Sequence, residues 1–163
     1  MKLTTIEQVQ KRVGKLPAPR DLKVIDYVDE HALRWLSYSS FGFFTFGRPG
    51  DIHVTAAGGV QGFVSVLDSG KLSVPLTALD NSITVKPDVS FGALFMVSGM
   101  EETLRVNGKV SGVADGLVSL QVEECYLHCA KSFRRSEFWL PTSIGEAPGE
   151  VAQFIKRSSF LVL

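Results

Sequence analysis

The chain has 163 residues, 45% of them hydrophobic and 21% charged, which is the composition of an ordinary globular protein long enough for one domain with a substantial core. Lysine plus arginine and aspartate plus glutamate both total 17, and this zero net charge argues against a nucleic-acid partner, because such proteins usually carry a basic surplus. The beginning of the chain lacks an apolar signal core, and no apolar run approaches the roughly 20 residues of a membrane-spanning helix, so we expect a cytoplasmic protein without a membrane partner.

The first predicted element is a helix from Asp26 to Leu36, which follows a proline-containing loop at residues 13–20. Asp26 is expected to cap the helix, and Asp29 and Glu30 lie in its first turn, where the helix dipole favours negative charge. A rough apolar face consists of Val28, Leu33, Trp35 and Leu36.

Residues 41–129 are predicted to form mostly strands joined by tight turns. Apolar or alternating runs, bounded by Gly, Pro, Asp and Ser, indicate strands at 41–46, 52–55, 63–67, 72–76, 91–97, 103–110 and 118–123. Pro75 marks an edge or an end of its strand, and the alternation across Asn107 and Gly108 predicts a kinked strand there rather than a turn. Six to seven short strands predict a mainly β fold, an antiparallel barrel or sandwich with a few peripheral helices.

The two cysteines, Cys125 and Cys129, lie at the end of this region. Four positions apart on a strand, they would share a face but stand roughly 13 Å apart, which is too far for a disulfide. A reducing, cytoplasmic setting fits this pair.

A basic and aromatic segment follows the last predicted strand. His128–Ser136 offers three cations and two hydroxyl groups, and two aromatic residues follow it. The cations are Lys131, Arg134 and Arg135, and the hydroxyl groups belong to Ser132 and Ser136. Convergent cations and donors suit a phosphate, and aromatic faces suit a planar heterocycle. The alternative is a solvated basic helix that its aromatic residues anchor.

A glycine-rich segment and an arginine-bearing strand are the other two candidates. Gly58, Gly59 and Gly62 would let a ligand approach the backbone closely, and the alternative is a bulge or a barrel corner. Arg105 alternates with apolar positions, so it points at solvent or at a partner subunit. The histidines lack metal-ligand spacing, no serine stands in a nucleophile elbow and no carboxylate pair suggests acid–base catalysis, so the sequence names no catalytic residue.

Taken in order, these segments resemble the FMN-binding split barrels related to pyridoxamine 5′-phosphate oxidase, and most closely a bacterial subgroup of uncharacterised members. The resemblance runs from about Asp26 to Trp139, and its most specific parts are Glu102–Gly108 and His128–Ser136. It implies a split β-barrel as a single domain over residues 1–163, with a core at about 26–139. The apolar tail at 140–163 is expected to pack on this core or on a second subunit.

The resemblance also implies a homodimer with FMN in a cleft between the subunits, and redox chemistry on a small-molecule substrate. Gly58, Gly59 and Gly62 would line this cleft through their backbone, and Arg105 would lie near the dimer interface. The other residues that the resemblance places at the cofactor are Asn81, Lys131, Ser132, Arg134 and Ser136.

The chain departs from the subgroup in two places. Ala56 and Ala57 stand where the subgroup has Pro-Arg before the glycine pair, and Ser82–Pro87 replaces an Arg and a helix after Asn81. Cations for the FMN phosphate are therefore missing on that side, and each lost charge-assisted contact costs about 1.5–3 kcal/mol. We expect an FMN-dependent oxidoreductase with weakened FMN binding. The alternative is a non-catalytic binding barrel that has lost its cofactor or changed it, for haem or another phosphate-bearing heterocycle.

Overall fold

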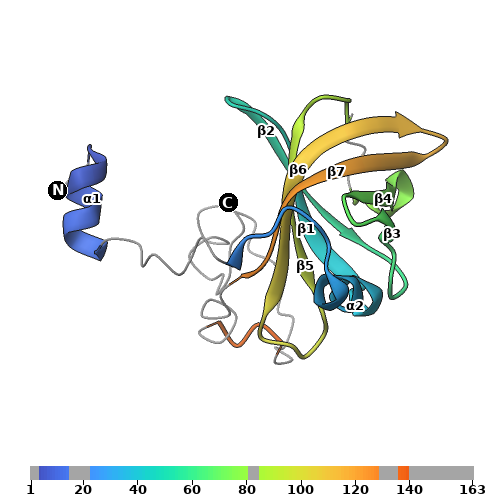
Figure 1. The fold of residues 1–163 in the computed structure, drawn as a ribbon, viewed down its shortest axis with the longest axis horizontal. Coiled ribbons are helices and arrows are strands. Elements are labelled where there is room, and N and C mark those ends of the chain that lie inside the picture. Colours follow the sequence, from blue (N-terminus) through green and yellow to red (C-terminus); the bar gives the residue numbers. More distant parts are fainter. Residues whose placement is uncertain (1–3, 15–22, 81–84, 129–135, 140–163) are drawn as a thin grey trace, which may run out of the picture.

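The computed structural model describes residues 4–14, 23–80, 85–128 and 136–139, and its fold is mainly β (Figure 1). In chain order, the elements are α1 (Ile6–Val13), α2 (Glu30–Tyr38), β1 (Phe41–Arg48), β2 (Asp51–Gly58), β3 (Ser65–Asp68), β4 (Lys71–Pro75), the 3-10 turn η2 (Leu76–Ala78), β5 (Ser90–Met96), β6 (Thr103–Ala114) and β7 (Leu117–His128). The prediction of a mainly β fold with antiparallel strands and a few helices is confirmed. Neither described α-helix has the length and the apolar run that a membrane crossing requires.

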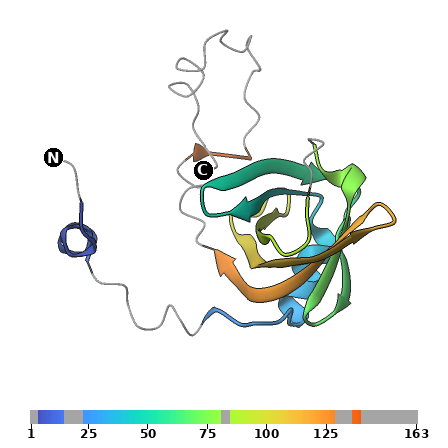
Figure 2. The same cartoon turned by 90° about the horizontal axis from the view of Figure 1, so that it is seen from above.

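The strands of the described residues form one antiparallel sheet with the order β2-β1-β5-β6-β7-β4-β3. The sheet coils on itself (Figure 2), so that the end of β2 meets the chain that follows η2. There Ala57 and Leu79 form an isolated bridge, and the backbone N–H of Asp80 donates to the carbonyl oxygen of Ala56 at 2.9 Å. These contacts make the sheet barrel-like and shield part of the β2 edge.

Side chains on the strands alternate between the barrel interior and its outer face. On β1, Phe44 and Phe46 are buried inside, whereas Phe41 and Phe43 point outward and are half-buried. Phe44 meets Phe95 of β5 edge to face with ring centroids 5.3 Å apart, an arrangement that aromatic pairs favour. The same alternation on the neighbouring strands encloses one apolar core.

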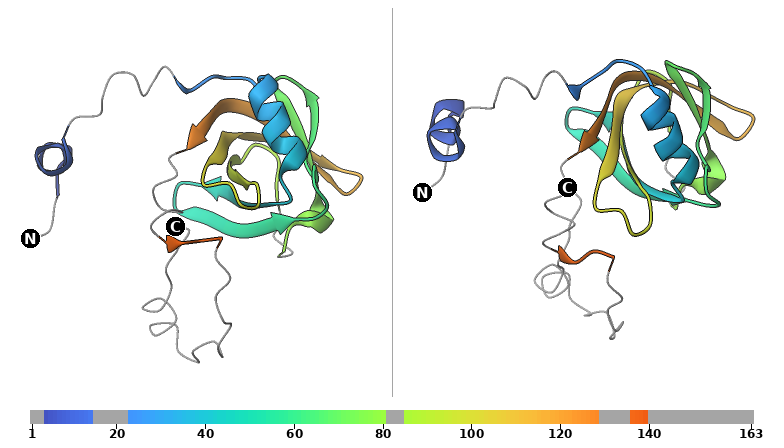
Figure 3. Two further views of the ribbon diagram at one scale, coloured as in Figure 1. Left: turned by 90° about the horizontal axis from the view of Figure 1, so that it is seen from below. Right: turned by 60° about the horizontal axis from the view of Figure 1, so that its bottom comes forward.

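Helix α2 lies across one end of the barrel (Figure 3) and begins later than the sequence predicts. Its N-cap is Asp29, whose carboxylate accepts the backbone N–H of Ala32 at 2.7 Å. The preceding chain is extended, because Ile25 pairs with Cys125 of β7 through two backbone hydrogen bonds of 3.1 and 2.7 Å. A helix cannot begin while the chain is held in this pairing, so the predicted cap at Asp26 is wrong.

Two side chains tie α2 to β5. The indole Nε1 of Trp35 donates to the carbonyl oxygen of Phe95 at 3.1 Å, and the hydroxyl of Ser39 donates to the carbonyl oxygen of Met96 at 2.8 Å. Leu36, on the same helix, is buried in the core. The helix is therefore fixed both by burial of its apolar face and by hydrogen bonds to the backbone of β5.

Turns and strand ends lie where the sequence predicts them at several points. Pro75 is the last residue of β4, and Asp115 and Gly116 form the turn between β6 and β7. The predicted kinked strand is also confirmed, since β6 continues through Gly108 with a register shift against β7. Glycine is required there because a Cβ would overlap the carbonyl oxygen of Gln121.

The crowding at Gly108 tests this register. We expect Gly108→Ala to lower the free energy of unfolding by about 1–3 kcal/mol, because the added methyl group meets backbone that moves only if both strands distort. Gly112→Ala in the same strand is the control, since that position faces open space. Its effect should stay within about 0.5 kcal/mol. Urea unfolding followed by circular dichroism measures both, and equal effects would contradict the register.

Candidate functional site

The predicted glycine site is packed against the chain that links α2 to β1. The backbone N–H of Gly59 donates to the carbonyl oxygen of Ser40 at 3.0 Å, and that of Gly62 donates to Ser39 at 2.9 Å. Gly62 has a φ of 73°, which favours glycine, and a Cβ at Gly58 would lie 3.0 Å from the Ser40 carbonyl oxygen. These contacts explain the glycines by packing, as expected if the segment is a corner of the barrel. Its role in ligand binding stays a prediction.

Gly58 nevertheless lies in one row of the sheet with a residue from each of the two segments that carry the strongest resemblance. The strand register aligns one residue from each of β2, β1, β5, β6 and β7 in a row, namely Gly58, Phe41, Met96, Thr103 and His128. Paired residues of an antiparallel sheet share a face, and Phe41 points outward, so we call this set the first outer row, although Met96 and Thr103 within it are each only 1% exposed. The beginning of His128–Ser136 thus lies beside the beginning of Glu102–Gly108.

Arg105 lies in a second outer row, formed by Ala56, Phe43, Leu94, Arg105 and Tyr126. Its Nε donates to Oδ1 of Asn107 at 3.2 Å, and Nδ2 of Asn107 donates to a carboxylate oxygen of Glu124 at 2.7 Å. This chain of hydrogen bonds orients the half-buried guanidinium. The second outer row therefore combines aromatic and apolar surface with one oriented cation.

Four of the predicted cofactor residues lie outside the described residues, and these are Asn81, Lys131, Ser132 and Arg134. The predicted tail at 140–163 lies outside them as well. Ser136 begins the described segment 136–139, where the indole Nε1 of Trp139 donates to the carbonyl oxygen of Met100 at 2.6 Å. Met100 belongs to the connection between Met96 and Thr103, so this segment lies near the end of the barrel that carries the first outer row.

The residues that replace the subgroup's Pro-Arg supply no cation. Ala57 is 2% exposed and belongs to the core, and Ala56 faces outward in the second outer row. Within the two outer rows, Arg105 is the one side chain that is charged at every physiological pH. The weakened FMN binding that the sequence suggests stays a prediction.

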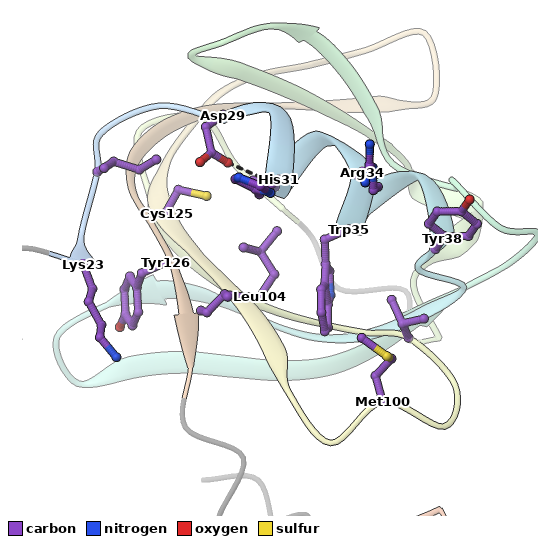
Figure 4. A pocket seen from close by; sticks show the side chains of 14 residues that line it. Lys23, Asp29, His31, Arg34, Trp35, Tyr38, Met100, Leu104, Cys125 and Tyr126 are labelled. Atoms are coloured by element: carbon purple, nitrogen blue, oxygen red, sulfur yellow. Dashed lines mark hydrogen bonds between the residues drawn. The ribbon is translucent and has the colours of Figure 1, made fainter.

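A pocket that the sequence did not predict lies at the α2 end of the barrel (Figure 4). Its volume is about 750 Å³, and it lies between α2, the β5–β6 connection, the end of β7 and the extended segment near Ile25. Aromatic and apolar side chains form much of its wall, among them Trp35, Tyr38, Met100, Leu104 and Tyr126. Four residues add polar or charged groups, namely Lys23, Asp29, His31 and Arg34. We call this the end pocket.

Cys125 lines the end pocket and is 1% exposed. Burial raises the pKa of its thiol to about 11, and the nearby carboxylate of Asp29 adds to the rise. The thiol is therefore neutral at physiological pH and forms part of the apolar wall rather than a nucleophile. It is a free cysteine, and Cys129 lies outside the described residues.

Neither a metal centre nor a known relative identifies the site. Among the described residues, no group of three or more His, Cys, Asp or Glu side chains could hold a metal ion. Comparison of the chain with models of protein families, with curated proteins and with solved structures finds no match in any of the three. The resemblance to flavin-binding barrels therefore stays an expectation from the sequence.

The neutral thiol predicts slow alkylation. In a Cys129→Ser variant at about pH 8, iodoacetamide should modify Cys125 at least about a hundredfold more slowly than an ordinary free cysteine, because only the thiolate reacts. Between pH 9 and 11 the reaction should accelerate and the fold should lose stability, since a raised pKa stabilises the folded state only while the thiol is protonated. Mass spectrometry measures the rate, with urea-unfolded protein as the control. Rapid modification of the folded protein at pH 8 would contradict this account of the thiol.

Proposed function

We propose that this protein is an FMN-dependent oxidoreductase, a homodimer whose flavin binds over the two outer rows. The observation that supports this most is the register of the sheet. It sets the start of His128–Ser136 beside Glu102–Gly108 and aligns both with Gly58. One residue from each of these segments, Gly58, Thr103 and His128, thus lies in one row of the sheet, although they are far apart along the chain.

The described residues suit the ring system of FMN better than its phosphate. Phe41 and Phe43 contact each other edge to face with centroids 5.2 Å apart, and with Leu94 they offer an apolar surface to a planar heterocycle. Arg105, oriented through its own Nε, can donate from its remaining N–H groups to an anionic oxygen. The flavin, when bound, supplies the electron transfer, and the protein binds and orients it. Further cations would come from His128–Ser136.

A second subunit would complete the cleft and cover apolar surface. Ile52 and Val54 of β2 extend the outer face beyond the two rows, and they are 64% and 42% exposed. Together with the half-buried Phe41 and Phe43 they form an apolar area of the kind that marks interfaces. A stable dimer needs roughly 800 Å² per partner, so the interface would extend across several strands.

A second candidate function is a non-catalytic binding barrel that has lost FMN or changed it for another ligand. The burial of Ala57 in the core favours it, because no cation reaches the phosphate from that position. This candidate predicts a protein that shows no oxidation of nicotinamide donors even when FMN is added. Under both candidates the outer rows remain the binding face.

Replacement of Arg105 tests the flavin face. We expect Arg105→Met to weaken FMN binding about tenfold to a hundredfold, because one charge-assisted contact is worth about 1.5–3 kcal/mol. Arg48→Met, at the exposed turn between β1 and β2, is the control and should bind FMN like the wild type. Quenching of flavin fluorescence measures both affinities. A wild-type protein that takes up no FMN at high micromolar concentration would contradict the proposal.

A charge on the outer face tests the homodimer. We expect Val54→Glu to convert the dimer into a monomer, since a carboxylate would lose its hydration in an apolar interface. Leu117→Glu is a matched control, because Leu117 is also 42% exposed but lies at the far hairpin between β6 and β7. Sedimentation velocity distinguishes the two states. A wild-type protein that sediments as a monomer at tens of micromolar would overturn the dimer and the shared cleft.

A further inference from the structure

We propose that the end pocket is a second ligand site, which binds an amphipathic carboxylate, a molecule with an elongated or planar apolar body and one carboxylate group. The walls of this site lie mainly on the other face of the sheet from the flavin face, and Tyr126 is a residue that both sites include. Leu104 contributes to the end pocket from the inner side of β6, whereas its neighbour Arg105 faces outward. The two proposals therefore rest on opposite faces of the same strand.

The size and the wall of the end pocket suit an apolar body. Its volume of about 750 Å³ falls within the roughly 300–1,000 Å³ of small-molecule sites. Trp35 forms one wall, and its hydrogen bond to the Phe95 carbonyl oxygen holds the indole against β5. The neutral thiol of Cys125 keeps another part of the wall apolar. The cavity is thus formed by groups that the fold already fixes.

The charges around the end pocket favour an anion. Lys23 and Arg34 are two cations in its lining, against the one carboxylate of Asp29. Asp29 already accepts the N–H of Ala32 as the helix cap, so its negative charge is partly compensated by the α2 N-terminus. Figure 4 shows Lys23 beside Tyr126 at one end of the pocket. It shows Arg34 on α2, away from Lys23 and Tyr126. Lys23 and Arg34 are both exposed, so the carboxylate of a ligand would lie at the mouth of the pocket beside one of them while its apolar body contacts Trp35.

Among the described residues, helix α1 is a competing occupant of the pocket. Helix α1 is amphipathic, with Ile6 and Val9 exposed by 76% and 41%, and it precedes the segment that reaches the pocket at Lys23. A carboxylate is favoured over this helix because α1 brings Lys11 and Arg12 in its last turn, which the cations of the pocket would repel. The experiment separates the two occupants.

Three ligands with the same tail and different head groups provide the test: dodecanoate and dodecyltrimethylammonium, each below its micelle concentration, and dodecan-1-ol below its solubility limit. Isothermal titration calorimetry on the full chain should show one dodecanoate bound per chain, at least tenfold more tightly than either of the others. The variant Lys23→Glu/Arg34→Glu should weaken dodecanoate at least tenfold and change dodecan-1-ol less than twofold. The control Arg48→Glu/Lys71→Glu changes the net charge equally outside the pocket and should leave dodecanoate binding unchanged.

The other outcomes each overturn the proposal. Equal binding of the three ligands would indicate apolar adsorption only, and equal weakening by both double variants would indicate a long-range charge effect. Dodecanoate binding that appears only in Ile6→Asp/Val9→Asp would show that α1 fills the pocket. Saturation with dodecanoate should leave FMN affinity unchanged, so failure of the flavin proposal and failure of this one give different results.

Discussion

The alternation of side chains along β1, β5 and β6 is the constraint on which the rest of the structure depends. Phe44, Phe95 and Val106 fill the core on these three adjacent strands, and burial of such side chains contributes about 1.5–3 kcal/mol each. The residue before each of them must then face outward, which creates the second outer row. A slip of β6 by one residue against β5 would bury Arg105 and expose Val106, so the core register also positions the candidate flavin face.

Helix α2 gives the barrel its second candidate site. A coiled sheet leaves its ends open, and α2 covers one end with Leu36 and the indole of Trp35 (Figure 3). The helix does not fill this end completely, and its residues His31, Ala32, Arg34, Trp35 and Tyr38 line the end pocket. The backbone pairing of Ile25 with Cys125 delays the start of the helix to Glu30. The same pairing also brings Lys23 to the pocket rim.

The sequence predicts what local patterns determine. Alternation predicts β6 through the bulge at Gly108, and turn residues predict the hairpin at Asp115, because both signals lie within a few neighbouring residues. It misses the true start of α2, which a partner about a hundred residues away decides. It also misses the end pocket, since Trp35 and Leu104 come together only through the barrel, and it leaves α1 unassigned although Thr5 caps it. The packing of Gly59 and Gly62 against Ser39 and Ser40, in the chain between α2 and β1, is also a contact between distant residues that the sequence does not predict.

The central claim is that FMN binds over the outer rows and not in the end pocket. A two-dimensional amide correlation spectrum of the full chain, titrated with FMN, tests it directly. The proposal predicts saturable shifts of the Arg105 Nε–H and of the backbone amides of Phe43 and Leu94, with the indole N–H of Trp35 unmoved. Shifts confined to the Trp35 indole, or no shift at high micromolar FMN, would contradict it.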